Sequence, residues 1–339
     1  MSRTGATTSK SSRDVVVFLT GGTIGMRRRA DGPGVAPGGG LGELFESLLP
    51  VEGVRVRTVE WSDRPSPHMT PEDMLRLARD IDSALSERGV CGAVVLHGTD
   101  LLAETSFLLD IALTSTKPVV TTGSMRHMEE AGYDGQRNLL NSILACLAMP
   151  RSSEVLVQIA DQLFTARDAI KLDSVSVDPL IGQRRGSVGR IAGSAVELTQ
   201  DVRVKRPRLP FPVTGLARRV PLVTCYPGMG GEVLETFARC AGEGGLNGLV
   251  LEGFGAGNVP PGLVPAIREL RAKDIPVVLA TRCVLGGVWP IYGYEGGAAQ
   301  LVTLGVIPAG PLSGIKAQLL LKAALGSGCP PGDLEKVFR

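Results

Sequence analysis

The sequence predicts an α/β fold in which a mostly parallel sheet is flanked by helices. Apolar runs of four or five residues alternate with segments of helical periodicity, which is the pattern of successive βαβ units. The length of 339 residues suits two domains of ordinary size. Prolines and basic residues interrupt the pattern at 201–220, so we expect a linker there, between a first domain at 13–200 and a second at 221–339.

The expected strands are short apolar runs bounded by glycine, proline or polar residues. A run of this length without polar alternation is typical of a strand that is covered on both faces of a parallel sheet. The runs lie at 15–19, 93–96, 118–121, 155–159, 248–252 and 276–280.

The clearest helix begins after residue 70. Thr70 is a favourable N-cap, Pro71 suits the first helical position, and the two acidic residues that follow face the positive end of the helix dipole. Apolar residues then recur on one face as far as residue 85. Further helices are expected at 103–113, 136–149, 232–241, 263–273 and 313–325.

The charge balance argues against nucleic acid and membranes as partners. With 36 basic and 34 acidic residues the net charge is +2, so no field of one sign would attract an anionic polymer or lipid surface. The basic cluster at 201–220 could form a nucleic-acid arm, but a solvated linker is the better interpretation. We expect a small-molecule partner or another copy of the chain.

The N-terminus and the hydropathy pattern predict a cytoplasmic protein. Residues 1–12 are polar, as in a flexible tail, and lack the apolar core of a signal peptide, and no run of 18 apolar residues follows. The six cysteines show no Cys-x-x-Cys spacing and the three histidines have no zinc-like neighbours. We therefore expect reduced thiols, no metal and no cofactor.

The loop after the first predicted strand places a hydroxyl where a nucleophile is useful. It reads Thr20-Gly21-Gly22-Thr23-Ile24-Gly25 and begins at the carboxyl end of the strand, where α/β proteins bind ligands. Its paired glycines let the backbone turn sharply and let a ligand approach the N–H groups. The loop lacks a dinucleotide fingerprint, and no Gly-Lys-Ser/Thr phosphate loop occurs in the chain. Thr23 is therefore a candidate nucleophile, with a purely structural turn as the alternative.

Three further polar segments follow predicted strands. They are His97-Gly98-Thr99-Asp100, Thr122-Gly123-Ser124-Met125-Arg126 and Arg167-Asp168-Ala169-Ile170-Lys171. Because parallel strands end at one edge of a sheet, Thr99 and Asp100 should lie across a crevice from Thr23. A threonine hydroxyl needs a neighbour to take its proton, which a suitably buried lysine oriented by an acid can do. Two threonines, Lys171 and Asp100 would form an acyl-transfer site without a histidine.

The loops that contain Thr23 and Thr99 resemble the two signature motifs of the bacterial-type L-asparaginases, a family of threonine-nucleophile amidohydrolases. The resemblance runs from about residue 15 to the C-terminus, and it implies a larger N-terminal domain and a smaller C-terminal α/β domain. It also implies a homodimer or homotetramer whose site is closed by a neighbouring subunit, acting on L-asparagine and more weakly on L-glutamine. The other similar segments are those at 122–126 and 167–171, Asp134-Gly135 with Asn138-Leu139, Gly255-Ala256-Gly257-Asn258-Val259-Pro260 and Thr281-Arg282-Cys283.

The resemblance implies a role for each matching residue. Thr23 matches the nucleophile, which attacks the side-chain amide, releases ammonia and leaves a β-aspartyl ester for water to hydrolyse. Thr99, Lys171 and Asp100 match the proton relay. Asn258 matches a residue that acts near the site of an adjoining subunit. Substrate contacts are implied for Gly22, Ser66, Thr99, Asp100 and Asn258, with Ser66 at the α-carboxylate and Asp100 at the α-amino group. Glu295 is a weaker candidate for an acid that the partner subunit supplies.

Several of these residues also have a simpler structural interpretation. Thr99 and Asp100 would suit the cap of the helix expected at 103–113. Lys171 and Glu295 could be surface charges, as most lysines and glutamates are. Ser66 and Asn258 could shape turns. His97 is interpreted as a hydrogen-bonded structural residue rather than a catalyst.

Two positions depart from the family pattern. The loop at 26–40 contains the triplet Arg27-Arg28-Arg29 but not the tyrosine that the family places there, and Pro67 follows Ser66 where a side-chain amide is common. Tyr292 and Tyr294 are candidate substitutes for the phenol. The relay could therefore work without this tyrosine, the arginines could attract a different or larger amide, or the acyl-transfer site could be impaired. In a separate hypothesis, the protein binds an amino acid without turnover.

Overall fold

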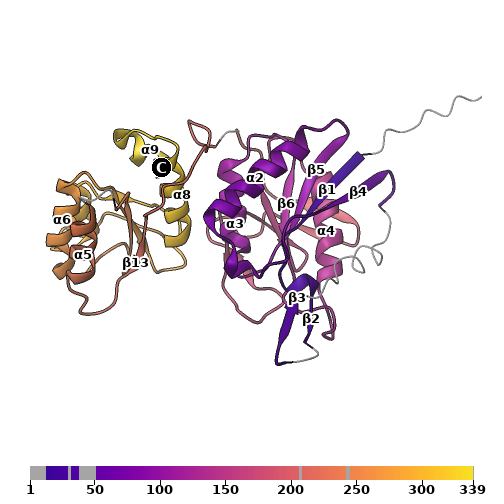
Figure 1. The fold of residues 1–339 in the computed structure, drawn as a ribbon, viewed down its shortest axis with the longest axis horizontal. Helices are drawn as coiled ribbons and strands as arrows, with labels where there is room; N and C mark the ends of the chain where they lie inside the picture. Colours follow the sequence, from indigo (N-terminus) through magenta and orange to yellow (C-terminus); the bar gives the residue numbers. More distant parts are fainter. Residues whose placement is uncertain (1–12, 30–31, 38–50, 206–207, 242–244, 339) are drawn as a thin grey trace, which may run out of the picture.

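The computed structural model describes residues 13–29, 32–37, 51–205, 208–241 and 245–338, and the tail expected at 1–12 lies outside these ranges. Two sheets form two α/β units that lie next to each other (Figure 1). The predicted fold class is confirmed, because a large, mostly parallel sheet flanked by helices precedes a smaller C-terminal α/β unit.

The first sheet has eight strands in the order β12-β11-β8-β7-β6-β5-β1-β4. Neighbours from β4 to β7 pair in parallel, whereas β8, β11 and β12 add antiparallel pairs at the opposite edge. Their bounds are β1 Arg13–Leu19, β4 Val54–Glu60, β5 Val90–Leu96, β6 Val119–Thr122, β7 Leu156–Ile159, β8 Gln162–Thr165, β11 Gly189–Ala192 and β12 Ala195–Leu198.

Helices cover both faces of this sheet. The helices α2 (Pro71–Ser86) and α3 (Leu102–Ala112) lie on one face, and α4 (Gly135–Ala148) lies on the other (Figure 1). Within β1, Val16 and Phe18 join the core beneath α2 and α3, whereas Val15 and Val17 join the core beneath α4. Burial on both faces explains why this strand is a continuous apolar run.

The expected strands and helices are all observed, with small shifts at their ends. The start of α2 is as predicted: the Thr70 hydroxyl accepts a hydrogen bond from the Asp73 N–H at 3.1 Å, and the Asp73 carboxylate accepts one from the Thr70 N–H at 3.2 Å. This reciprocal capping satisfies two N–H groups that the helix itself leaves without partners.

The sequence did not predict two parts of the large sheet. The edge strand β4 reads Val-Arg-Val-Arg-Thr-Val-Glu. Its charged residues, which are typical of an edge strand, interrupt the continuous apolar run by which the other strands were predicted. The hairpin from β7 to β8 turns at Ala160 and Asp161, which have φ angles of 49° and 64° although neither is glycine. Contacts with α4 hold this turn, because the Asp161 carboxylate accepts hydrogen bonds from Arg137 and Asn141, each at 2.6 Å.

The second sheet contains four parallel strands, β13 (Leu222–Thr224), β14 (Leu249–Gly253), β15 (Val277–Thr281) and β16 (Ile307–Pro308). Its outer face carries α5 (Glu232–Ala241) and α6 (Val264–Ala272), and its inner face carries α8 (Gly314–Gly326), which packs against α3 of the first unit (Figure 1). One apolar cluster contains residues of both units, so the core is continuous between them.

The remaining elements are short. Within the described ranges no helix is long and apolar enough to cross a membrane. The short elements are β2 Met26–Arg28, β3 Val35–Pro37, β9 Ala169–Lys171, β10 Leu180–Gly182, α7 Ala298–Thr303 and α9 Leu334–Phe338, with 3₁₀ turns at Thr23–Gly25, Ser66–His68, Pro261–Leu263 and Pro331–Asp333.

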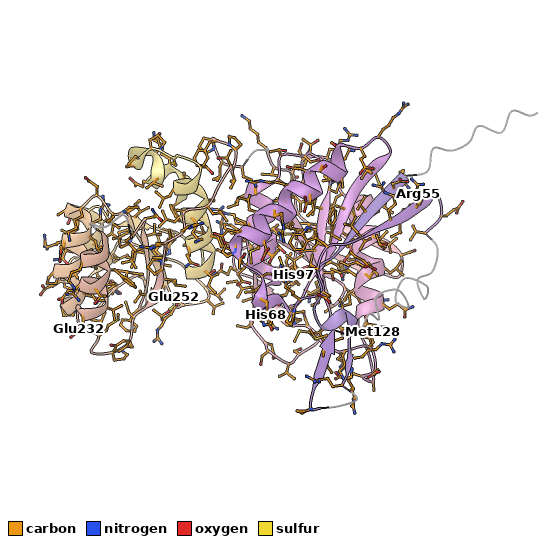
Figure 2. All side chains as sticks on the ribbon, viewed as in Figure 1. Arg55, His68, His97, Met128, Glu232 and Glu252 are labelled. Atoms are coloured by element: carbon orange, nitrogen blue, oxygen red, sulfur yellow. The ribbon has the colours of Figure 1, made fainter. Side chains whose placement is uncertain are left out.

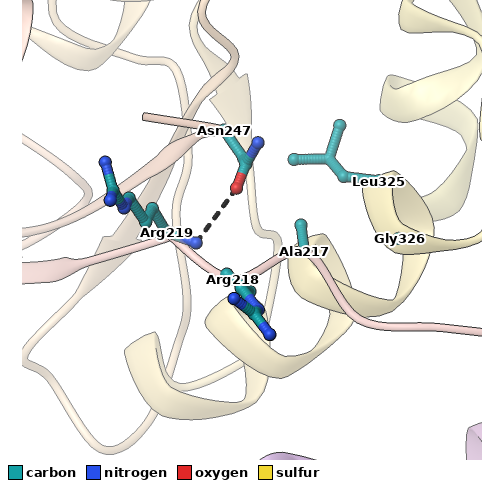
Figure 3. A pocket seen from close by; sticks show the side chains of 6 residues that line it. All are labelled: Ala217, Arg218, Arg219, Asn247, Leu325 and Gly326. Atoms are coloured by element: carbon teal, nitrogen blue, oxygen red, sulfur yellow. Dashed lines mark hydrogen bonds between the residues drawn. The ribbon is translucent and has the colours of Figure 1, made fainter. Parts of the chain in front are cut away.

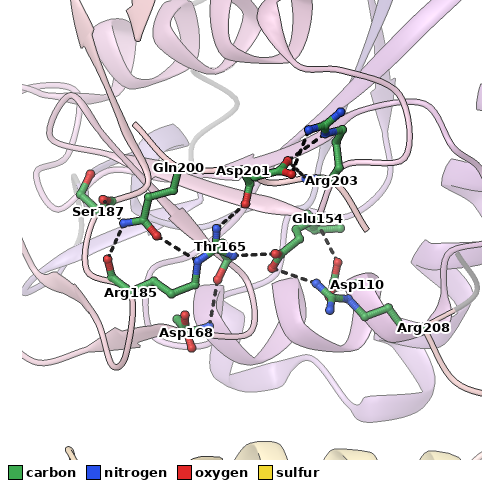
Figure 4. Close-up of polar contacts among 11 residues, drawn as sticks. Asp110, Glu154, Thr165, Asp168, Arg185, Ser187, Gln200, Asp201, Arg203 and Arg208 are labelled. Carbon is green, nitrogen blue, oxygen red and sulfur yellow. Dashed lines mark hydrogen bonds and ion pairs between the residues drawn. The ribbon is translucent and has the colours of Figure 1, made fainter. Parts of the chain in front are cut away.

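The segment expected as a solvated linker carries a buried charge instead. The Arg208 guanidinium is largely buried and forms ion pairs with Asp110 and, at 2.8 Å, with Glu154 (Figure 4). Arg185 pairs with the same Glu154 at 2.7 Å. For Arg208 the expectation of solvation was wrong, because two carboxylates compensate its charge inside the protein.

The end of the same connecting segment lines a cavity between the segment and the second unit. The residues that line it are Ala217, Arg218, Arg219, Asn247, Leu325 and Gly326 (Figure 3).

The contact between Gly92 in β5 and Cys146 in α4 gives a test of packing. Five cysteines in the described ranges are free thiols, and Cys146 is buried, which raises the pKa of its thiol. A Cβ atom on Gly92 would overlap the Cys146 sulfur and lie 2.9 Å from the Pro118 carbonyl oxygen. We expect Gly92→Ala to lower the free energy of unfolding by about 1–3 kcal/mol. In urea unfolding, Cys146→Ala should cost less in the Gly92→Ala background than in the wild type; additive effects would contradict this packing.

Candidate active site

Three neighbouring strands end at the same level of the large sheet. Leu19 of β1 pairs with Leu96 of β5, and Leu96 pairs with Thr122 of β6. The loops after these strands therefore leave from one edge, as the sequence predicted. Thr20 connects the loop after β1 to the end of β5, because both its N–H (3.0 Å) and its hydroxyl (2.7 Å) donate to the Leu96 carbonyl.

Glycines bring the backbones of these loops into direct contact. Gly22 has a φ angle of 95°, and a Cβ atom on it would overlap the backbone of Gly98. A Cβ atom on Gly98 would in turn lie 2.6 Å from the Ser66 hydroxyl oxygen, and one on Gly123 would overlap the His97 carbonyl. Only glycine fits such approaches, so these residues set how closely the polar loops can gather.

Thr23 is held at the start of a short 3₁₀ turn, Thr23–Gly25, directly after this glycine contact. Its side chain is half-buried, whereas Ile24 next to it is fully buried in the core beneath α4. The buried neighbour anchors the turn and keeps the threonine hydroxyl at the carboxyl edge of the sheet. This is the location that the sequence predicted for a nucleophile.

The predicted Thr-Lys-Asp group is assembled. The Lys171 ammonium donates to the Thr99 hydroxyl at 3.0 Å and to the Asp100 carboxylate at 2.7 Å. Thr99 is buried and the Lys171 side chain is only 18% exposed, whereas the Asp100 side chain is 62% exposed. A buried hydroxyl in contact with a lysine can pass a proton, and an exposed carboxylate can meet a cationic ligand.

Ser66 lies beside this group and is buried, at 3% exposure. It begins the turn Ser66–His68, and the Met69 N–H donates to its carbonyl at 2.9 Å. Pro67 is the second residue of that turn, where proline's fixed φ is compatible with the helical backbone and an N–H would have no partner within the turn. The departure from the family pattern at Pro67 thus has a local structural reason.

Asn258 and Glu295 lie in the second unit. The Asn258 side chain accepts a hydrogen bond from the Ala298 N–H at 3.2 Å, and its backbone pairs with Phe254, so it shapes the turn after β14. Glu295 is exposed. In the described part of a single chain, neither forms a hydrogen bond with Thr23, Thr99, Asp100 or Lys171, and the structure does not bring them together within one subunit.

His97, on the loop that carries Thr99, is a buried structural residue of the first unit (Figure 2). One ring nitrogen lies 2.8 Å from the Gly98 carbonyl and must donate to it, so the other, 2.9 Å from the Thr105 hydroxyl, accepts. Burial lowers the pKa of His97 from 6.5 to about 4, which keeps the ring neutral. Within the described ranges, no group of three or more His, Cys, Asp or Glu side chains is arranged to hold a metal.

Sequence reasoning missed a tyrosine beside the Thr23 turn. The Tyr133 hydroxyl donates to the Ile24 carbonyl at 2.7 Å, and its ring lies over Gly135 at the start of α4, where a Cβ atom would overlap it. Burial and the charge of Asp134 raise the pKa of this phenol, which therefore stays protonated and donates. Tyr292 and Tyr294, the substitutes considered from the sequence, are exposed and lie against each other. The sequence did offer one signal for this contact: Gly135, which follows Tyr133-Asp134 and leaves room for the tyrosine ring.

Comparison with known families covers nearly the whole chain. The family model described as "Asparaginase, N-terminal" matches residues 14–203, and "Glutaminase/Asparaginase C-terminal domain" matches residues 219–338. The chain belongs to the asparaginase family. This confirms the resemblance that the motifs around Thr23 and Thr99 indicated.

Individual family members align over nearly their full length. The chain is 39% identical over 326 residues to "Probable L-asparaginase" of Deinococcus radiodurans, covering 96% of each chain. It is 31% identical to "L-asparaginase" of Bacillus licheniformis, covering 93% of this chain and 96% of the relative. Among solved structures, the thermostable L-asparaginase from Thermococcus kodakarensis superposes with a TM-score of 0.83 at 27% identity and 96% coverage of both chains. The "Probable Cytoplasmic L-asparaginase" from Campylobacter jejuni gives 0.81 at 28% identity, covering 96% and 99%.

The hydrogen bond from Tyr133 predicts an effect on the Thr23 turn. Tyr133→Phe keeps the ring and removes only the hydroxyl, so the Ile24 carbonyl loses its donor. We expect the free energy of unfolding to fall by about 1 kcal/mol and turnover to fall roughly tenfold, because small shifts of a reacting group are costly. Tyr226→Phe, at an exposed tyrosine of the second unit, is the control. Wild-type turnover in Tyr133→Phe would show that the turn needs no such support.

The buried His97 predicts a loss of stability in acid. Its folded-state pKa of about 4 lies below the unfolded value of 6.5, so the unfolded chain binds a proton first as the pH falls. Its contribution is fully present above pH 6.5, and about 3 kcal/mol of it is lost between pH 6.5 and 4. Urea midpoints measured across this range should fall less steeply for His97→Gln than for the wild type. His68→Gln, at an exposed histidine, should keep the wild-type slope.

Proposed function

We propose that this chain is an L-asparaginase, which hydrolyses L-asparagine to L-aspartate and ammonia through an ester on Thr23. The observation that carries the proposal is the contact of Lys171 with both Thr99 and Asp100. These two residues lie on the loop whose Gly98 packs against Gly22 of the Thr23 loop. The relatives named above as L-asparaginases support the same reaction.

In the proposed first step the Thr23 oxygen attacks the carbon of the side-chain amide. The Thr23 proton passes to the Thr99 hydroxyl as that hydroxyl gives its own proton to the Lys171 nitrogen, which acts as the base and which Asp100 holds in place. The relay returns this proton to the amide nitrogen, the carbon–nitrogen bond breaks and ammonia leaves. Water then attacks the β-aspartyl ester by the same route, which frees aspartate and restores the Thr23 hydroxyl.

In the proposed binding mode, the polar ends of the amino acid contact the loops around Thr23. Lys171 contacts one carboxylate oxygen of Asp100, and the second is available to the substrate's α-ammonium group. The buried Ser66 hydroxyl is a neutral donor for the α-carboxylate, and the Gly22 backbone lets the substrate approach closely. Thr99 lines the site between them.

We further propose a homodimer or homotetramer in the cytoplasm, in which Asn258 and Glu295 act next to the Thr23 of an adjoining subunit. The segment that contains Glu295 also exposes large apolar side chains, among them Leu285, Trp289 and Ile291 at 60%, 61% and 69% exposure. Exposed apolar clusters of this kind mark protein interfaces. The cytoplasmic location is supported by the name of the Campylobacter structure, whereas a relative from Haemophilus influenzae is named periplasmic.

A second candidate substrate is a different or larger amide with acidic groups. The hairpin of β2 and β3 follows the Thr23 turn directly and carries the arginine triplet at 27–29. The Arg28 N–H donates to Glu129 at 2.9 Å, which fixes this hairpin near the site. Basic side chains there would attract acidic substituents that L-asparagine lacks.

Ammonia release tests the proposal, with L-asparagine, L-glutamine and D-asparagine as substrates. We expect rapid release from L-asparagine by the wild type and a loss of at least about 1,000-fold in Thr23→Val, which keeps the side-chain shape without the nucleophile. Thr23→Ser keeps a hydroxyl and should retain measurable turnover. Unchanged activity in Thr23→Val would exclude Thr23 as nucleophile. No release by a folded wild type from any of the three would favour another amide, or amino-acid binding without turnover.

A further inference from the structure

A lysine of the C-terminal unit is buried against the first unit, close to the relay. Lys316 lies in α8 and has 0% exposure. Its ammonium donates to the backbone carbonyls of Ala166, Arg167 and Ala169 at 2.9, 3.1 and 2.5 Å. All three N–H groups of the ammonium are therefore used on one short segment of the other unit.

The surroundings of Lys316 compensate only part of the cost of burying a charge. The ring of Phe107 in α3 lies 5.7 Å from the nitrogen, a cation–π contact. The charged groups that act on it are Glu104, Asp168 and Asp110, which favour the ammonium, and Arg167, which opposes it. Desolvation outweighs them and lowers the pKa of Lys316 to about 8. The three carbonyl bonds are thus the main direct compensation for the buried ammonium.

The segment that Lys316 holds leads directly into the strand of the relay lysine. Ala169 begins β9 (Ala169–Lys171), and Lys171 ends it. Among the strands of the described residues, β9 pairs only with β10, in a two-stranded sheet separate from the eight-stranded one. A pair of three-residue strands is too small to fix its own position, so contacts outside the pair must place it. Lys316 supplies three of these contacts.

We propose that Lys316 is a positioning residue for the relay: it fixes the backbone before β9 so that the Lys171 nitrogen reaches Thr99 and Asp100. The proton relay in the first unit then depends on the docking of α8 from the second unit. The inference rests on the proposed function only for its kinetic readout, because the position of β9 can be measured without any substrate.

Glu104 gives this arrangement an electrostatic readout. Glu104 lies in the first turn of α3. Burial raises the pKa of its carboxyl group, and the charges of Lys316 and Lys171 oppose this rise by a smaller amount. Removing the Lys316 charge should therefore raise the pKa of the Glu104 carboxyl group, which lies close enough to Lys171 to feel its charge. A purely mechanical role in packing α8 would change stability without changing the pH dependence of turnover.

The chain contains a matched control on the same helix. Lys322 is also a buried lysine of α8, at 7% exposure, and it donates to a backbone carbonyl, that of Arg218, at 2.9 Å. That carbonyl lies in the segment that lines the cavity in Figure 3, in the connection between the two units rather than beside β9. Lys316→Met and Lys322→Met therefore remove equivalent groups, of which only the first contacts the relay segment.

The experiment compares both variants with the wild type in kinetics and in hydrogen exchange. For Lys316→Met we expect kcat for L-asparagine to fall about 10- to 100-fold with KM changed much less, and the pH profile of kcat to shift. Exchange at the amides of β9 and of Leu172, whose N–H donates to Pro179 at 2.8 Å, should become faster. Lys322→Met should keep the wild-type kcat, pH profile and exchange at β9.

Several outcomes would overturn the inference. Wild-type kcat and exchange in Lys316→Met would do so, as would equal losses in the two variants. Lys316→Gln, which keeps two N–H donors without the charge, provides a milder change and should give intermediate exchange at β9. Global unfolding of both Lys316 variants would count against the inference, because Lys316 would then serve the whole fold rather than the relay. A wild type without asparaginase activity would refute the proposed function, and faster exchange at β9 in Lys316→Met would still support the positioning role.

Discussion

The contact between the backbones of Gly22 and Gly98 is the constraint on which the rest of the site depends. Because neither residue has a side chain, the loops after β1 and β5 touch directly, and Ser66 packs on the same spot. A larger residue at either position would separate the Thr23 turn from Thr99. Since β1, β5 and β6 also end in register, the sheet and these glycines together define where a substrate can lie.

The relay lies in the first unit, but its residues come from two separate sheets of that unit. Thr99 and Asp100 follow a central strand of the large sheet, whereas Lys171 lies on a short strand outside that sheet. Buried charges join the parts: Lys316 holds the backbone before Lys171, and Arg208 joins the connecting segment to α3 and the β6–β7 connection through two carboxylates. Burying such charges is costly unless they are compensated, so each of them fixes one arrangement of its neighbours.

Tyr133 changes how the missing loop tyrosine is interpreted. The loop after Thr23 has no tyrosine in its sequence, but the hydroxyl of Tyr133, just before α4, donates a hydrogen bond to the carbonyl of Ile24 next to Thr23. Tyr133 acts on the backbone of the turn and not on the threonine oxygen, so it supports the position of Thr23 without itself being a base.

The sequence by itself determined the α/β class, the main strands and helices, and Thr23, Thr99, Asp100 and Lys171 as candidates, because these depend on local periodicity and on motifs contiguous in the chain. It did not indicate the edge strand β4, the hairpin at Ala160-Asp161, the burial of Arg208, or the roles of Tyr133 and Lys316. Each of these depends on a partner far away in the chain: Tyr133 binds Ile24, and Lys316 binds the backbone before β9. Local patterns carry no information on such pairs, so only the tertiary structure could decide them.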